Sequence, residues 1–208
     1  MLKILGRKTS SNVQKVLWVA DEIGLKYERT DIGGPFGGND KPDYLKLNPN
    51  GKVPTIIEDD GWVMWESNAI TRYLAARHAP GTLYPNDLRQ RASAERWMDW
   101  QSNTVSPQMV MVFRGLVRTP PEKRDMAALK QGIAESARAW GIMDAALAKH
   151  SYIAGPEFTL ADIAFGVHVH RWLNMKVEGR PDMPHLSAWY QCLLQRPVYV
   201  KRCAGPIV

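Results

Sequence analysis

The spacing of hydrophobic residues divides the chain into two parts that meet near residue 80. In the first part, short apolar runs alternate with segments of helical spacing, and the turn signal Asp59-Asp60-Gly61 separates the last two runs. This pattern predicts the order β-α-β-α-β-β-α, a small α/β domain with parallel strands first and an antiparallel hairpin last. The predicted strands cover residues 3–5, 26–32, 53–57 and 62–64, and the predicted helices cover 13–23, 42–47 and 67–78.

The second part shows helical spacing only. Helices are predicted over 88–117, 125–150 and 184–195, and Thr159-Leu160-Ala161-Asp162 has the spacing of a capping box that opens another. Pro107 lies inside the first of these helices and should kink it. The chain is therefore predicted to combine an α/β domain, residues 1–80, with an all-α helical-bundle domain, residues 88–208.

Composition and charge narrow the possible functions. The chain has 208 residues and a net charge of +6, which favours anionic ligands. The basic residues are scattered without a run of four, so nucleic-acid binding is not expected. No apolar run approaches the ~20 residues of a membrane span. The N-terminal apolar run is too short for a signal peptide and the only cysteines are Cys192 and Cys203, so we expect a cytoplasmic protein without a disulfide scaffold.

Hydroxyl and amide side chains gather where the first predicted helix begins, at Thr9-Ser10-Ser11-Asn12. Open α/β sheets bind ligands at such a position. A serine O–H there could donate to a thiolate held at the helix N-terminus. Capping of the helix is a simpler explanation of the same residues.

Two further segments offer polar groups to a peptide-like ligand. Val53-Pro54 opens a strand, and a cis peptide there would leave Val53 free to pair with a bound peptide. Since few X-Pro bonds are cis, the sequence favours a trans proline at the strand edge. Glu66-Ser67 precedes a helix, where Ser67 is the expected N-cap; the helix end attracts a carboxylate, and Glu66 could accept an ammonium. An ordinary cap beside an acid explains this pair equally.

These segments occur together in an order and spacing that resembles the glutathione transferases over nearly the whole chain, with bacterial theta-, phi- and nu-like members of the serine or asparagine type as the nearest pattern. The resemblance implies a thioredoxin-like N-terminal domain, a helical C-terminal domain and a homodimer. It is carried by the hydroxyl cluster, by Asn48-Pro49 followed by Lys52-Val53-Pro54, by Trp65-Glu66-Ser67-Asn68-Ala69-Ile70, and by Phe158-Thr159-Leu160-Ala161-Asp162-Ile163-Ala164.

The resemblance also implies a position for the catalytic group. The frame set by Val16 selects Ser10, with Ser11 as a close rival, and the Thr-x-Asn pattern of nu-like members maps onto Ser10 and Asn12. Glutathione would be the co-substrate, and no cofactor is expected. No cysteine precedes Cys192, which argues against the omega- and beta-like cysteine enzymes of the superfamily and against a glutaredoxin-type dithiol mechanism.

The remaining glutathione contacts are carried over by position as well. Asn39 stands where theta- and phi-like members commonly have a histidine, and with Lys52 it would hold the glycine carboxylate. Val53 would pair with the ligand backbone. Glu66 and Ser67 would hold the γ-glutamyl end.

The resemblance implies that the second, electrophilic substrate lies between the two domains. Its candidate walls are Met109, Phe113, Arg114 and Trp172. A methionine and aromatic stripe at helical spacing is also typical of a core. His168 and His170 lie two residues apart and face different sides of a helix, so no metal site is expected.

Three functions are consistent with the sequence. The first is a glutathione transferase that activates the glutathione thiolate for attack on a small electrophile. The second is a glutathione-dependent disulfide-bond reductase or peroxidase on the same fold, which the Ser-x-Asn pattern suggests. The third is a non-catalytic binding protein, against which the presence of Lys52, Glu66 and Ser67 argues.

Overall fold

A computed structural model describes residues 1–207 of the chain and divides it into two compact units. The first unit ends at Tyr84, and the second begins at Pro85.

The first unit is built on a four-stranded mixed sheet with the order β2-β1-β3-β4. β1 pairs with β2 in parallel and with β3 antiparallel, and β3 pairs antiparallel with β4 across the hairpin. The predicted topology of the sheet is confirmed. The strands are β1 (Leu2–Leu5), β2 (Tyr27–Thr30), β3 (Thr55–Ile57) and β4 (Val63–Trp65).

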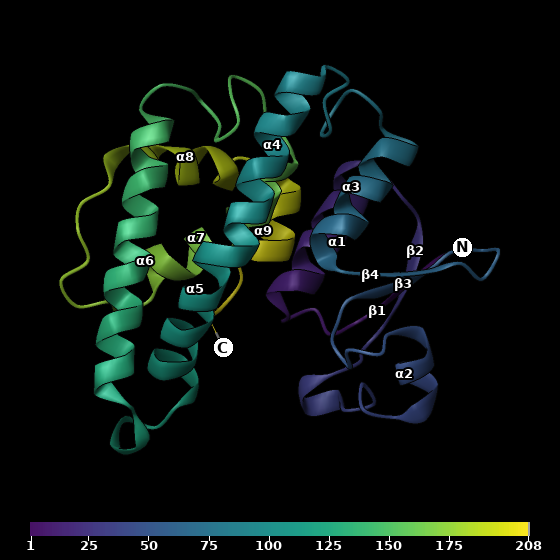
Figure 1. Cartoon of the computed structure of the whole chain (residues 1–208), viewed down its shortest axis with the longest axis horizontal. Coiled ribbons are helices and arrows are strands. Elements are labelled where there is room, and N and C mark those ends of the chain that lie inside the picture. The colour runs from purple at the N-terminus through teal and green to yellow at the C-terminus, as the bar shows by residue number, and fades with distance from the viewer. Residues whose placement is uncertain (208) are drawn as a thin grey trace. The chain divides into compact units, whose positions relative to one another are not determined.

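Helices cover both faces of this sheet (Figure 1). α1 (Ser11–Glu22) and α3 (Ser67–His78) pack together on one face, and α2 (Pro42–Leu47) lies on the other, following a short 3-10 turn, η1 (Gly34–Phe36). The core between the sheet and the two helices consists of fully buried apolar side chains, among them Ile4, Val16, Ile56, Ile70 and Leu74. This layering leaves the loops at the ends of β1 and β2, and the turn before β3, on one edge of the unit.

Among its described residues, the second unit contains helices and connecting loops and no strand. It contains α4 (Leu88–Trp100), α5 (Ser106–Phe113), α6 (Met126–Leu147), α7 (Leu160–Asn174), α8 (Pro184–Leu194) and α9 (Pro197–Cys203), with a 3-10 turn, η4 (Pro121–Lys123), before α6. Two π-helical turns, η2 (Gln101–Val105) and η3 (Arg114–Arg118), flank α5. η2 lies just before Pro107, which has no N–H to donate within a regular α-helix, so the regular hydrogen bonding is interrupted where the sequence predicts a kink.

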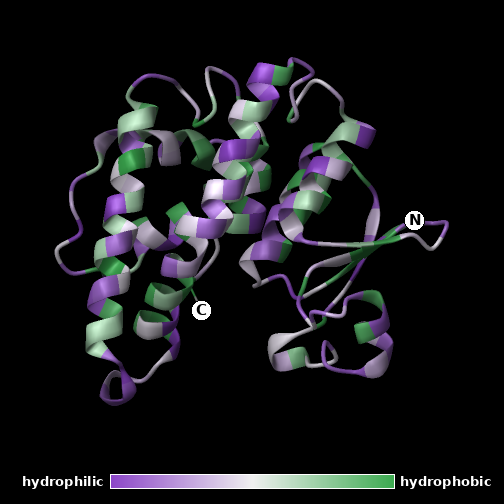
Figure 2. Cartoon of the chain, in the orientation of Figure 1, coloured by the Kyte–Doolittle hydropathy of each residue, from purple (hydrophilic) through white to green (hydrophobic). Residues whose placement is uncertain are grey.

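The capping box predicted at the start of α7 is present. The Thr159 hydroxyl accepts from the N–H of Ala161, and the Asp162 carboxylate accepts from the N–H of Thr159 at 2.9 Å. Behind it, Trp140, Phe165 and Trp172 are fully buried and form the centre of the helical core. Hydrophobic and hydrophilic residues alternate along the helices (Figure 2), and none of the described helices is long and apolar enough to span a membrane.

Candidate functional site

The start of α1 presents the predicted hydroxyl cluster. Ser10 is the N-cap residue, with φ −78° and ψ 125°, but its side chain makes no capping hydrogen bond. Its backbone is fixed instead, because its N–H donates to Arg7 O at 3.1 Å and its carbonyl accepts from Gln14 N at 2.9 Å. Ser10, Ser11 and Asn12 are all partly buried. The capping interpretation of the Ser10 hydroxyl is therefore not supported, and the hydroxyl is available to a ligand at a helix N-terminus.

The turn before β3 presents the Val53 backbone. The Val53-Pro54 peptide is cis, so the trans proline favoured from sequence is wrong. Within the described residues, neither the N–H nor the C=O of Val53 has a hydrogen-bond partner. Two buried side chains anchor the neighbouring residue: the Tyr44 hydroxyl donates to Lys52 O at 2.6 Å, and Asn48 Nδ2 donates to the same oxygen at 2.8 Å. The local structure thus holds an unpaired peptide group in a fixed place, where an extended peptide could pair with it.

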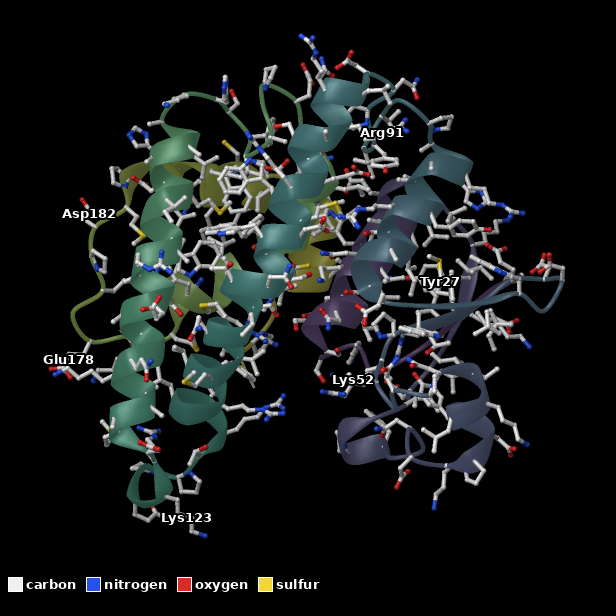
Figure 3. The ribbon with its side chains drawn as sticks, in the orientation of Figure 1. Tyr27, Lys52, Arg91, Lys123, Glu178 and Asp182 are labelled. Atoms are coloured by element: carbon white, nitrogen blue, oxygen red, sulfur yellow. The ribbon has the colours of Figure 1, made fainter. Side chains whose placement is uncertain are left out.

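Asn39 and Lys52 lie on the same side of the unit as this turn. Asn39 Nδ2 donates to Gly51 O at 2.7 Å, which ties residue 39 to the segment that carries Lys52. Lys52 has an exposed side chain and lies between α2 and the sheet (Figure 3). The structure therefore brings the two predicted carboxylate-binding residues into one neighbourhood.

The start of α3 differs in one detail from the prediction. Glu66, and not Ser67, is the N-cap residue, because the backbone of Glu66 has φ 74° and ψ 108° and cannot continue the helix. Glu66 is the one described non-glycine residue with positive φ, and such a conformation is costly and concentrates at functional sites. Its side chain is exposed, whereas Ser67 is buried in the first helical turn. An acid and a hydroxyl are thus held next to helix N–H groups, as a zwitterionic ligand end requires.

A buried lysine supports this turn from below. Lys15, on α1, is only 3% exposed, and its ammonium donates to Asn68 Oδ1 at 3.0 Å. Burial lowers the pKa of Lys15 to about 7, while the nearby Glu66 raises it and Arg72 lowers it further. Because Lys15 and Asn68 are 53 residues apart in the chain, this contact joins the start of α3 directly to α1.

Comparisons with known proteins agree with this geometry. The model of the glutathione S-transferase N-terminal domain family matches residues 9–77, and that of the C-terminal domain family matches residues 126–192. Glutathione S-transferase GstB of Escherichia coli is 40% identical over 208 residues, covering the whole of both chains. The chain belongs to the glutathione S-transferase family. Glutathione S-transferase 3 of Zea mays is 34% identical over 98% of this transferase and 94% of its own length.

A solved structure supports the same assignment. The theta class glutathione S-transferase from Xanthomonas axonopodis pv. citri, with glutathione bound, matches with a TM-score of 0.94 and 44% identity, covering 100% of this chain and 99% of that one. The predicted fold, a thioredoxin-like glutathione transferase domain followed by a helical domain, is confirmed.

The four residues predicted to line the second-substrate site differ in their solvent exposure. Met109 and Trp172 have no exposed surface, and Trp140 Nε1 donates to Met109 Sδ at 3.3 Å, so both occupy the core of the helical unit. Phe113 is nearly buried, with the guanidinium of Arg171 4.0 Å from its ring centroid. Of the four, only Arg114 is exposed. Within the described residues, no group of three metal-ligating side chains occurs.

Two residues that the sequence did not single out lie near the candidate site in the first unit. One is Lys15, and the other is Arg7, which lies beside Val53 and Asn39. A lysine directly before the apolar run Val16-Leu17-Trp18-Val19-Ala20 was a signal for a buried cation. Arg7 gave no signal of its own, because the residues beside its side chain, Gly33, Gly34, Asn39 and Val53, lie 26 and more residues away.

Proposed function

We propose how this glutathione transferase acts: glutathione lies across the loops of the first unit, and its thiol is activated at the start of α1. The observation that carries the proposal is the Ser10 hydroxyl, which stands at the N-terminus of α1 and makes no capping bond. Val53 would pair with the ligand backbone, and Glu66 and Ser67 would bind its γ-glutamyl end. Asn39 and Lys52 would bind its glycine carboxylate.

The energy required is within the reach of these groups. Lowering a thiol pKa from ~8.5 to ~6.5 takes about 2.7 kcal/mol. One hydrogen bond from a hydroxyl to the thiolate supplies about 1.5–3 kcal/mol, and the helix N-terminus adds about 0.3–1 kcal/mol. Ser10, with Ser11 or Asn12 assisting, is therefore sufficient without a metal or a second thiol.

The thiolate would then attack an electrophilic carbon. A sulfur–carbon bond forms, the leaving group departs with its electron pair, and the thiol proton has already passed to solvent. Residues 1–80 would bind glutathione, and residues 88–208 would contribute the electrophile site, where the exposed Arg114 could steady an anionic substrate. Met109, Phe113 and Trp172 are buried, so they would shape that site only by packing behind its surface.

Replacement of the hydroxyls tests this mechanism. Ser10→Ala should lower kcat/KM toward a chloronitroarene by roughly 10- to 100-fold, the loss of one hydrogen bond to a charged group. The pH at which the rate reaches half its maximum should move upward, since the bound thiol would regain its ordinary pKa. Ser11→Ala and Asn12→Ala show which neighbour assists. Full activity in the Ser10→Ala, Ser11→Ala double variant would contradict the mechanism.

A glutathione-dependent disulfide-bond reductase is a second candidate, because Ser10 and Asn12 both lie at the start of α1, where the thiol would bind, and the first unit carries no cysteine. Here one glutathione thiolate attacks a disulfide sulfur and displaces one substrate thiolate, which leaves a mixed disulfide. A second glutathione thiolate attacks the glutathione sulfur of that mixed disulfide, forms glutathione disulfide and displaces the other substrate thiolate. Rates measured side by side with a chloronitroarene and with a small disulfide separate the two activities. Absence of glutathione binding in calorimetry would favour a non-catalytic binding protein.

Family membership supports a proposal for the assembly and the location. A homodimer in the cytoplasm is the arrangement we propose, with glutathione and a small electrophile as the only ligands required. Sedimentation equilibrium tests the dimer, since the chain mass is 23.5 kDa and the dimer has twice that value.

A further inference from the structure

Arg7 follows β1 and lies against a turn made of two glycines. A Cβ placed on Gly34 would stand 2.8 Å from Arg7 Nε and 3.1 Å from Arg7 Cζ, so the side chain crosses directly over this residue. Gly33 and Gly34 have φ of 82° and 61°, in the left-handed region that favours glycine. The two glycines therefore leave the space that the Arg7 side chain occupies.

The tip of Arg7 faces the peptide-binding turn. A Cβ on Gly33 would stand 3.3 Å from Arg7 Nη1, 3.5 Å from Val53 Cγ1 and 3.6 Å from Asn39 Oδ1. These three atoms thus border one small space. The backbone before Arg7 approaches the same turn, since a Cβ on Gly6 would stand 3.2 Å from Val53 Cβ.

We propose that Arg7 is a further glutathione-binding residue, which binds the glycine carboxylate of the co-substrate. The inference rests on the proposed function, in which Val53 pairs with the middle of the tripeptide. Glu66 and Ser67 take one end of the ligand, so the Asn39 side of Val53 is left for the glycine end. Arg7 lies on that side.

The chemistry of the guanidinium fits this task. Its planar fork matches a carboxylate in a bidentate geometry that a lysine ammonium cannot reproduce. Arg7 is partly buried, so solvent screens its attraction for a carboxylate less than it screens that of the exposed Lys52. It places a cation close to the neutral Asn39.

Calorimetry with two ligands tests the inference. Glutathione has the glycine carboxylate, and its glycine monoethyl ester does not. The wild-type protein should bind the ester roughly tenfold or more weakly than glutathione, as expected for the loss of a charge-assisted hydrogen bond. Arg7→Met should bind glutathione roughly tenfold more weakly and the ester with little change, so the preference should fall to the part that Asn39 and Lys52 maintain. Arg7→Lys should retain part of the preference.

Lys8→Met is the matched control, because it removes a neighbouring, exposed positive charge; it should keep the full preference for glutathione. Circular dichroism and thermal unfolding verify that each variant is folded, and Arg7→Gln serves if the Met variant is not. An undiminished preference in the Arg7 variants would overturn the inference. Equal weakening of both ligands would also overturn it, since that indicates a role in the glycine turn only. A wild-type protein that binds neither ligand would overturn the proposed function itself.

Discussion

At the residue scale, the first unit of the transferase contains two residues whose conformation or burial is energetically unfavourable. Glu66 has a positive φ, and Lys15 is a buried cation beneath it. Glu66 caps α3, and Lys15 reaches the start of α3 from α1, where a ligand carrying an ammonium and a carboxylate would bind. Residues whose conformation or burial lowers stability are typical of a site whose geometry is kept for ligand binding and not for stability.

The substitution Glu66→Gly separates the contribution of Glu66 to ligand binding from its effect on stability. Glycine adopts φ 74° without a Cβ penalty, so the free energy of unfolding should rise by on the order of 1 kcal/mol, even after the entropy cost of glycine. Glutathione should bind more weakly, because the carboxylate that accepts its ammonium is gone. Urea unfolding and calorimetry measure the two effects. Glu66→Gln, which keeps the Cβ, should lose affinity without gaining stability; a Gly variant no more stable than Gln would contradict the argument.

Lys15 makes stability depend on pH. Its folded-state pKa, about 7, lies below its ordinary value of 10.5, so between these values the unfolded chain binds more protons and stability rises with pH. Between pH 7 and 9, the free energy of unfolding of the wild type should therefore gain on the order of 2 kcal/mol relative to Lys15→Met. Urea unfolding at both pH values measures this change. Lys26→Met, at an exposed position, should show no such dependence, and a pH-independent difference for Lys15→Met would refute the prediction.

At the element scale, the start of α7 depends on one buried carboxylate. Asp162 is fully buried and accepts from Thr159 N at 2.9 Å, from Ile153 N at 3.1 Å and from Trp189 Nε1 at 2.9 Å. Burial raises the pKa of Asp162 to about 6, and these hydrogen bonds oppose the rise. The carboxylate therefore joins a helix start, the preceding loop and α8.

Asp162→Ala should accordingly cost at least about 3 kcal/mol of unfolding free energy, because it leaves three donors without an acceptor. Asp125→Ala is a matched control, since Asp125 caps α6 with a single, exposed bond to Ala128 N and should cost about 1 kcal/mol. Chemical unfolding compares the two. Similar losses would show that Asp162 acts as an ordinary cap.

The helices also show which features of the fold can be predicted from the sequence and which cannot. Residues 67–78 were predicted as a helix and form α3 over that same range, because the apolar spacing and the turn before it are both local signals. α9 was missed: its Val-Tyr-Val run has weak helix propensity, and Tyr199 secures it by donating from its hydroxyl to Gly166 O, 33 residues away. In the candidate site, Ser10 and Val53 were predicted from motifs, and their roles stay predictions. Arg7 and Lys15 were not predicted, since their contacts depend on distant segments.

At the scale of the whole molecule, the net charge of +6 acts together with the local cations of the glutathione site. Glutathione carries two carboxylates and one ammonium, so it is an anion at neutral pH. Attraction between the positive protein and this ligand extends over a Debye length, about 10 Å at 0.1 M salt and about 3 Å at 1 M. Charges beyond the site therefore contribute at low salt and are screened at high salt.

Raising NaCl from about 0.05 to about 0.5 M should thus increase the KM for glutathione several-fold with little change in kcat, since screening weakens binding of the anion and leaves the bound thiolate within its fixed donors. The glycine monoethyl ester, which has no net charge, should show a much smaller increase over the same range. Sucrose at matched osmolality controls for effects of the solute other than charge. An equal rise in KM for glutathione and for its ester would mean that salt acts on the protein and not on the attraction between protein and ligand, and long-range charge would then have no part in recruiting the co-substrate.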